Sequence, residues 1–147
     1  MEDRILPYDY DAEEGVLNAA FYPGGMSKIL PILTADDFYS ETARLIFSRL
    51  MDYHESERGF TLFSIDQIFQ EHSEYINIRR ALDTVRPFTA EAGPYFAKIV
   101  KELADRRRAI KASYETFENL FDLSKSIGQV MYFLRVELLS IAEEGLS

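Results

Sequence analysis

The chain has 147 residues, the size of one domain with a single hydrophobic core. Its 25 acidic and 16 basic residues give a net charge of −9, which repels a phosphate backbone, so strong direct binding of nucleic acid is not expected. No apolar run is long enough to cross a membrane, and the acidic first residues differ from a signal peptide, so we expect a soluble, cytoplasmic protein. Cysteine is absent, which excludes disulfides and thiolate sites.

Two helices are expected at the start of the chain. Asp11 and Glu14 match a capping box, in which the two side chains satisfy backbone N–H groups of the first turn. The apolar stripe that follows must end at Pro23-Gly24-Gly25. A second, short helix can begin at Ser27 and run through Leu33.

A central helix is expected within Thr34 to Tyr53, ending at about Ser56. Ser40 can act as its N-cap, because a hydroxyl there accepts a hydrogen bond from an unpaired N–H of the first turn. The residues that recur at three- and four-residue steps are expected to lie on one buried face: Ala43, Ile46, Phe47, Leu50 and His54.

Two further short helices are expected before the character of the chain changes. Ser64 and Gln67 form a second capping box, and Asn77 can cap a helix that Pro87 closes. No segment shows sustained alternation with a period of two, so the predicted fold class is all-α. Residues 1–93 are predicted to form a compact globule of about five short to medium helices.

Residues 94–147 are predicted to form a long antiparallel helical hairpin that packs on the globule, so that both parts make one domain. Apolar residues alternate four- and three-residue steps from Pro94, break around Asp122 to Ser126, and then resume. The hairpin can bury this seam against itself. Because its helices carry more apolar surface than one mutual seam needs, we favour self-association. The predicted self-association residues are Phe96, Val100, Leu103, Ile110, Tyr114, Phe117, Phe121, Ile127, Met131, Leu134 and Leu138.

No catalytic, metal-binding or cofactor-binding constellation is predicted. His54 and His72 lack a second ligand at helical spacing. The segment from Gly24 to Lys28 lacks the Gly-Lys-Ser/Thr order of a phosphate loop. The adjacent carboxylates Glu13 and Glu14 are expected to be helix-start charges favoured by the helix dipole. A hydrolase that uses carboxylates with a divalent metal stays an alternative that tight, stoichiometric metal binding would support.

One basic cluster, Arg106 to Arg108, could contact nucleic acid. It lies among Glu102 and Asp105, and pairing at i,i+3 and i,i+4 spacing can neutralise part of its charge. We therefore favour a solvated helix face over a nucleic-acid site at this cluster.

Three stretches of the chain form a recognisable series. The first is Pro7 to Leu17, with a proline, acidic residues and Val-Leu. The second joins Asp37-Phe38-Tyr39 to Arg44-Leu45-Ile46-Phe47, and the third joins Tyr95 to Val100 with Arg107-Arg108. With these stretches the chain resembles the N-terminal domain of DnaB-type replicative DNA helicases, over roughly residues 7 to 125. Their order and spacing agree with that family, so together they are more specific than any one of them.

The resemblance implies a helical globule with a hairpin through which such domains pair, the pairs forming a ring-shaped collar. In that family the phosphate loop, ATP and Mg²⁺ belong to a separate motor domain, and the collar binds primase and, in some bacteria, a helicase loader. The leading hypothesis is therefore an excised or naturally truncated collar domain that is not an enzyme. The alternative is a free-standing adaptor or inhibitor that mimics the collar and competes for primase or the ring.

Overall fold

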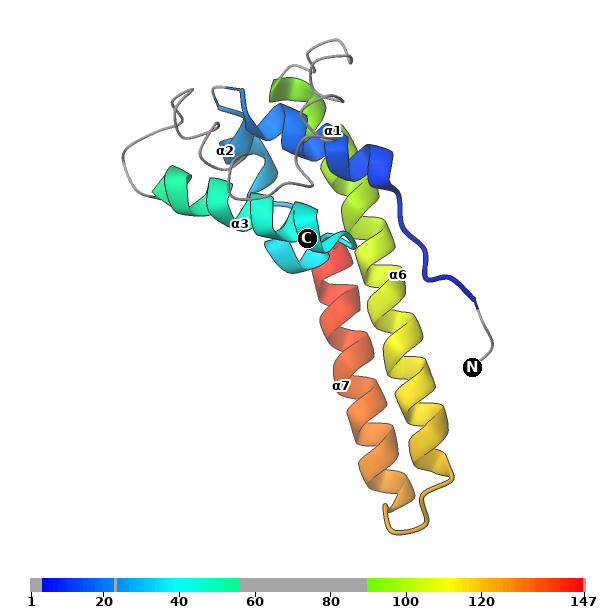
Figure 1. Ribbon diagram of the computed structural model, residues 1–147. Coiled ribbons are helices and arrows are strands. Elements are labelled where there is room, and N and C mark those ends of the chain that lie inside the picture. Colours follow the sequence, from blue (N-terminus) through cyan, green and yellow to red (C-terminus); the bar gives the residue numbers. More distant parts are fainter. Residues whose placement is uncertain (1–3, 23, 56–89, 147) are drawn as a thin grey trace. The chain divides into compact units, whose positions relative to one another are not determined.

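A computed structural model of the chain describes residues 4–22, 24–55 and 90–146 (Figure 1). Every regular element in these three ranges is a helix, which confirms the all-α class. The elements are α1 (Tyr10–Ala20), α2 (Gly25–Ile29), the 3-10 turn η1 (Ala35–Asp37), α3 (Glu41–Glu55), the 3-10 turn η2 (Ala90–Ala92), α6 (Gly93–Leu120) and α7 (Ile127–Leu146). The helices expected around Ser64 and Asn77, and His72, lie outside the described residues.

The chain divides into two compact units, residues 8–101 and residues 1–7 together with 102–147. The boundary between the two units lies within α6. The division at residue 93, and the packing of the hairpin on the globule, stay predictions. None of the described helices is long and apolar enough to cross a membrane.

Helix α1 begins earlier than the capping box at Asp11 suggested. Asp9 has an extended backbone, with φ −146°, and its carboxylate accepts a hydrogen bond from the N–H of Ala12 at 3.0 Å. Asp11 lies inside the first turn instead, so the predicted cap was wrong. Both carboxylates are suitable caps in sequence, and the one that precedes the helical backbone takes the role.

Helix α2 runs from Gly25 to Ile29, so it begins before the predicted Ser27 and ends before the predicted Leu33. Gly24 serves as its N-cap with φ 81°, a left-handed conformation that glycine adopts without steric cost. The next residue, Gly25, lies so close to α1 that a Cβ there would overlap the carbonyl oxygen of Ala19. The glycine pair thus closes one helix and starts the next, rather than only ending α1.

Helix α3 matches its prediction at the start and on its buried face. The hydroxyl oxygen of Ser40 accepts a hydrogen bond from the N–H of Ala43 at 3.2 Å, which confirms the N-cap. The residues confirmed as buried are Ala43, Ile46, Phe47 and Leu50. His54 is exposed, contrary to the prediction. The last buried residue of α3 is Leu50, and His54 lies in the final turn of the helix, after that residue.

The core of residues 8–101 is built from all three short helices and the first turns of α6. Phe38 and Phe47 pack against each other with ring centroids 4.9 Å apart. Each fully buried side chain of this size stabilises the fold by about 1.5–3 kcal/mol. Other fully buried members are Val16, Leu17, Met26, Ile29, Leu33, Ile46, Leu50 and Val100.

In the other unit, α7 runs back along α6 after a short turn, as an antiparallel hairpin (Figure 1). The turn coincides with the predicted break and is held by its own polar side chains. The carboxylate of Asp122 accepts hydrogen bonds from the N–H and hydroxyl of Ser124, at 3.0 and 2.6 Å, and these bonds lower the pKa of Asp122. Ser126 and Gln129 exchange hydrogen bonds of 3.0 and 3.1 Å, a reciprocal cap that fixes the start of α7.

Candidate protein-interaction surface

The described residues do not bring catalytic or metal-binding side chains together. Within residues 4–22, 24–55 and 90–146, no three His, Asp or Glu side chains could jointly hold a metal ion. Two carboxylates are nevertheless buried, Glu13 and Asp37, and both have structural partners. The partners of these two carboxylates show whether they belong to a functional site or stabilise the fold.

Glu13 joins α1 to the start of α3. Its side chain is 3% exposed, and its two oxygens accept hydrogen bonds from the N–H groups of Tyr39 and Ser40, each at 3.1 Å. Glu13 lies in the first turn of α1, as expected of a helix-start charge, but its carboxylate is also buried and bonded to the start of α3. Its partners lie 26 and 27 residues away, beyond the reach of local sequence patterns.

Asp37 is held in a similar way at the turn before α3. One carboxylate oxygen accepts a hydrogen bond from the N–H of Thr34 at 2.8 Å, and the other lies 3.6 Å from the ammonium of Lys101. Asp37 is fully buried, and such a carboxylate requires partners of this kind. Both buried acids thus stabilise the fold, and neither is placed to act on a substrate.

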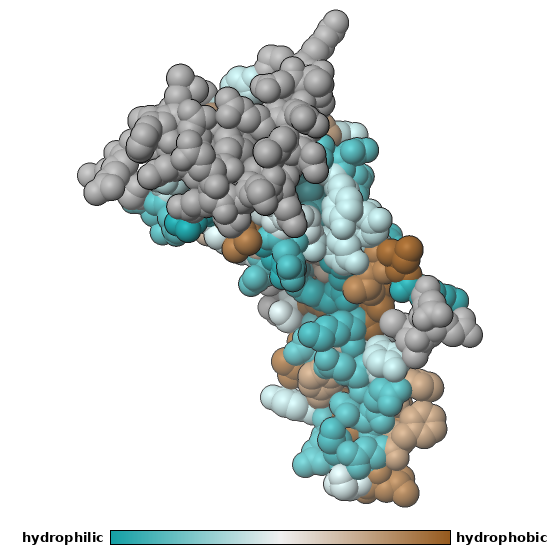
Figure 2. All heavy atoms as spheres, viewed as in Figure 1, coloured by the Kyte–Doolittle hydropathy of each residue, from teal (hydrophilic) through white to brown (hydrophobic). Residues whose placement is uncertain are grey.

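The surface of the hairpin is different, because large apolar side chains lie on it. Of the eleven predicted self-association residues, five are exposed: Phe117, Phe121, Ile127, Met131 and Leu138. Four are partly buried: Leu103, Ile110, Tyr114 and Leu134. Of the remaining two, Val100 is buried in the core of residues 8–101, and Phe96 is partly buried and packs against that core. Figure 2 shows hydrophobic side chains along the hairpin helices.

Five more exposed apolar side chains lie on the same hairpin. They lie outside the eleven predicted self-association residues, and all are at least 45% exposed: Leu120, Leu123, Tyr132, Val136 and Leu139. On α7 three of them are spaced by four and three residues, which gives a second apolar stripe beside the predicted one. Leu123, 95% exposed, lies in the turn, where no helical period could have selected it.

Small side chains occupy buried positions within the hairpin. Ala112, Thr116 and Val130 are buried, and the Thr116 hydroxyl donates to the carbonyl oxygen of Ala112 at 2.8 Å, so it is satisfied. Small residues on facing helices let the backbones approach closely, and this leaves the larger side chains outside. The hairpin therefore does not cover its own large apolar side chains.

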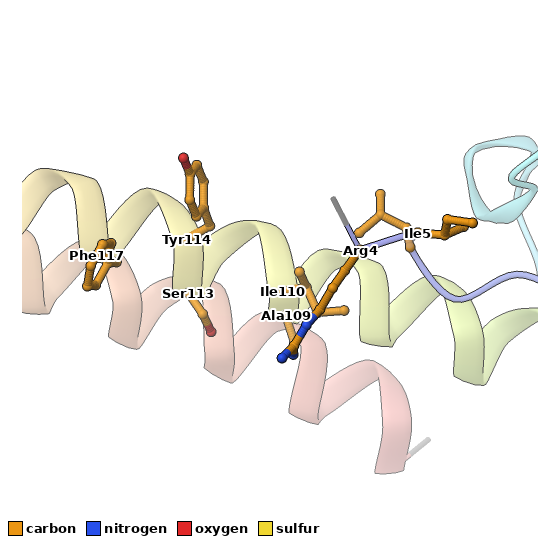
Figure 3. A pocket seen from close by; sticks show the side chains of 8 residues that line it. Arg4, Ile5, Ala109, Ile110, Ser113, Tyr114 and Phe117 are labelled. Atoms are coloured by element: carbon orange, nitrogen blue, oxygen red, sulfur yellow. The ribbon is translucent and has the colours of Figure 1, made fainter. Parts of the chain in front are cut away.

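An apolar groove of about 590 Å³ continues this surface onto the N-terminal segment. Its walls include Arg4, Ile5 and Leu6 on one side and, on α6, the predicted residues Ile110, Tyr114 and Phe117. Figure 3 shows the side chain of Arg4 next to those of Ala109 and Ile110. A hydrogen bond of 2.8 Å from the guanidinium of Arg107 to the carbonyl oxygen of Pro7 ties the segment to the helix.

The arginine cluster on α6 is neutralised locally, as predicted. Arg106 pairs with Glu102 at 3.0 Å, and Arg108 pairs with Asp105 at 3.0 Å, at i,i+4 and i,i+3 spacing. With Arg107 bonded to Pro7, each arginine has a partner within its own unit. This favours a solvated, structural role over a nucleic-acid site.

Sequence comparison assigns this helical fold. The family model described as the DnaB-like helicase N terminal domain matches residues 5–102. The chain belongs to this family. The resemblance carried by the three stretches is therefore confirmed, and the match concerns the N-terminal domain of such helicases.

Two relatives define the extent of the similarity. The replicative DNA helicase DnaB of Synechocystis sp. is 25% identical over 130 residues, which cover 84% of this chain and 15% of that protein. This chain thus spans about 15% of the length of that relative. The crystal structure of the N-terminal domain of DnaB helicase from Mycobacterium tuberculosis shares the fold, with a TM-score of 0.77 at 19% identity, covering 92% of this chain and 99% of that one.

Proposed function

We propose that this chain acts as the non-catalytic N-terminal domain of a replicative DNA helicase and that its protomers pair through the hairpin. The observation that carries the proposal is the set of ten exposed large apolar side chains on the turn and the two helices of residues 117–139. A surface of this kind is costly in water and is typical of a protein–protein interface. The family of the chain supplies the context for that interface.

In this proposal the paired domains assemble into a collar that docks primase or a helicase loader during DNA replication in the cytoplasm. ATP and Mg²⁺ act only in a separate motor domain, so this chain carries no cofactor of its own. The net charge of −9 supports protein partners over a phosphate backbone. The groove beside Phe117 continues the apolar surface, so the N-terminal segment belongs to the proposed pairing face.

Sedimentation equilibrium of the purified chain tests the pairing, with a species of at least twice 17.0 kDa expected. Titration with the purified primase of the same organism tests docking separately. An adaptor or inhibitor role predicts that the added chain lowers primase binding to an assembled helicase ring. A helicase domain predicts that the coding frame continues past Ser147 into a Gly-Lys-Thr motor.

A further inference from the structure

Three tyrosine rings gather at the surface of residues 8–101, at the start of α1 and just before α3. The rings of Tyr8 and Tyr39 are stacked, with centroids 4.8 Å apart and an angle of 11° between planes. Tyr10 completes the tyrosine cluster, with its centroid 4.5 Å from that of Tyr8 and 6.1 Å from that of Tyr39. Tyr8 is 40% exposed and Tyr10 is 47% exposed, so the cluster is a surface feature and not part of the core.

The backbone on both sides of the cluster is fixed by carboxylates. Asp9, between the two exposed tyrosines, caps α1 through Ala12. Glu13 accepts hydrogen bonds from the N–H groups of Tyr39 and Ser40, so it ties the Tyr39 segment to α1. The rings are therefore held in place before any ligand binds, which lowers the conformational entropy lost on binding.

The charged residues that adjoin the cluster on α1 are acidic, and the two nearby basic groups are already engaged, Arg107 with the carbonyl oxygen of Pro7 and Lys101 with Asp37. Asp9, Asp11, Glu13 and Glu14 lie in or beside the first turn of α1. The sequence has no basic residue between Arg4 and Lys28. Burial, and then the neighbouring Tyr8, Tyr39 and Glu13, raise the pKa of Tyr10, so additional negative charge is disfavoured at its hydroxyl. The faces of aromatic rings also carry negative electrostatic potential.

We propose that the tyrosine cluster is a docking site for an arginine-containing basic segment of a partner protein. A guanidinium is planar and can stack on tyrosine faces, while its N–H groups remain able to pair with a carboxylate such as that of Asp11. Arginine fits better than lysine, whose compact ammonium cannot stack in this way. A phosphate backbone is excluded by the sign of the surrounding charge. None of the three tyrosines lies on the hairpin helices, so the proposal is independent of protomer pairing.

The test is a titration of the whole chain, labelled with ¹³C at tyrosine, with an end-capped hexa-arginine peptide followed by NMR. The chain has nine tyrosines and no tryptophan, and the peptide adds no aromatic signal. We expect saturable shifts centred on Tyr8, Tyr10 and Tyr39, with hexa-arginine binding several-fold more tightly than hexa-lysine. The salt concentration is about 0.15 M, where the Debye length is about 8 Å and diffuse attraction is weak.

Variants locate the binding. Tyr8→Ala with Tyr10→Ala should weaken hexa-arginine at least tenfold, whereas Tyr132→Ala, which removes a 70% exposed tyrosine from α7, should leave the affinity unchanged. If the double variant unfolds by circular dichroism, Tyr10→Ser, at the most exposed ring of the three, replaces it. The proposal would be overturned if hexa-arginine bound the variants of Tyr8 and Tyr10 as tightly as the unaltered chain, or if hexa-arginine and hexa-lysine bound equally.

A last variant separates this proposal from hairpin pairing. Phe117→Asp with Phe121→Asp changes only side chains of the other unit. Hexa-arginine should bind that variant with unchanged affinity, whatever its oligomeric state. A loss of binding there would place the peptide on the hairpin and contradict the assignment to the tyrosine cluster.

Discussion

Replacing Glu13 by glutamine should destabilise the fold far more than its conservative chemistry suggests. The carboxylate is 3% exposed and accepts two backbone hydrogen bonds at 3.1 Å, from Tyr39 and Ser40. A hydrogen bond to a charged group contributes about 1.5–3 kcal/mol, and a buried donor left without an acceptor costs about 1–3 kcal/mol. Glutamine keeps one acceptor oxygen and turns an NH₂ donor toward the other N–H. We therefore expect a loss of about 2–4 kcal/mol in the free energy of unfolding.

Urea denaturation at pH 7, followed by circular dichroism, measures this loss directly. For a chain of 147 residues, 1 kcal/mol corresponds to about 2–4 °C, so Glu13→Gln should lower the melting temperature by roughly 4–16 °C. Both proteins are compared at the same protein concentration, because association would add to the apparent stability.

Glu14→Gln is the matched control on the same helix. Burial, and then Asp11, raise the pKa of Glu14 in the folded state, so its ionised form is less favourable there than in the unfolded chain. The contribution of a group with a raised pKa is fully present below the unfolded value and is lost as the pH rises through the folded value. Glutamine does not titrate, so Glu14→Gln should stabilise at pH 7, and this advantage should vanish below the ordinary pKa of 4.5.

The two variants together decide the role of Glu13. If Glu13→Gln cost less than about 0.5 kcal/mol, or no more than Glu14→Gln, the carboxylate would not hold the start of α3. A large loss for Glu13→Gln beside a small gain for its neighbour would show that the two hydrogen bonds stabilise the fold.

Two further changes probe the helix starts. Gly25→Ala should destabilise the fold by about 3 kcal/mol or more, because the added Cβ would meet the backbone of Ala19. Gly128→Ala should instead stabilise α7 by about 0.5–1 kcal/mol, because no atom lies closer than 3.9 Å to its added Cβ. A similar loss of stability for both variants in thermal melts would contradict this packing. Ser40→Ala should lower the free energy of unfolding by about 1 kcal/mol in urea denaturation, because the hydrogen bond from the N–H of Ala43 is lost. Ser40→Asp should retain most of the stability, because its carboxylate can accept the same bond. An equal loss of stability for both variants would contradict the capping role of Ser40.

The features that the sequence predicted correctly are local. The Ser40 cap, the pairing of Arg106 and Arg108, and the break between α6 and α7 each depend on residues within a few positions of one another. At that range the helical geometry fixes which side chains meet, so spacing alone is informative.

The features that were missed depend on distant partners or on competition between equivalent residues. The bonds of Glu13 reach Tyr39, 26 residues away, and no spacing rule connects them. Asp9 and Asp11 are both good caps, and only the backbone conformation distinguishes them. For the hairpin, heptad steps selected apolar positions but could not show that small residues such as Ala112 are buried while Phe117 is exposed.

The central claim is that the exposed hairpin residues pair protomers. Phe117 and Phe121 are 56% and 72% exposed, so replacing them by Asp should not disturb the fold. Burying a fully exposed phenylalanine contributes about 1.5–3 kcal/mol. Because just over half of one ring and about three quarters of the other remain to be buried, and each occurs twice in a symmetric pair, the double variant should lose at least about 4 kcal/mol of association free energy. That corresponds to a dissociation constant raised by roughly three orders of magnitude or more. Leu45→Asp, at a 51% exposed position on α3, is the control.

The most direct measurement is the mass of these three proteins by sedimentation equilibrium, at matched concentrations and with helix content checked by circular dichroism. The account predicts a mass of at least twice 17.0 kDa for the unaltered chain and for Leu45→Asp, and 17.0 kDa for the chain with Phe117→Asp and Phe121→Asp. A monomeric unaltered chain, or an unchanged mass for the double variant, would contradict pairing through the hairpin.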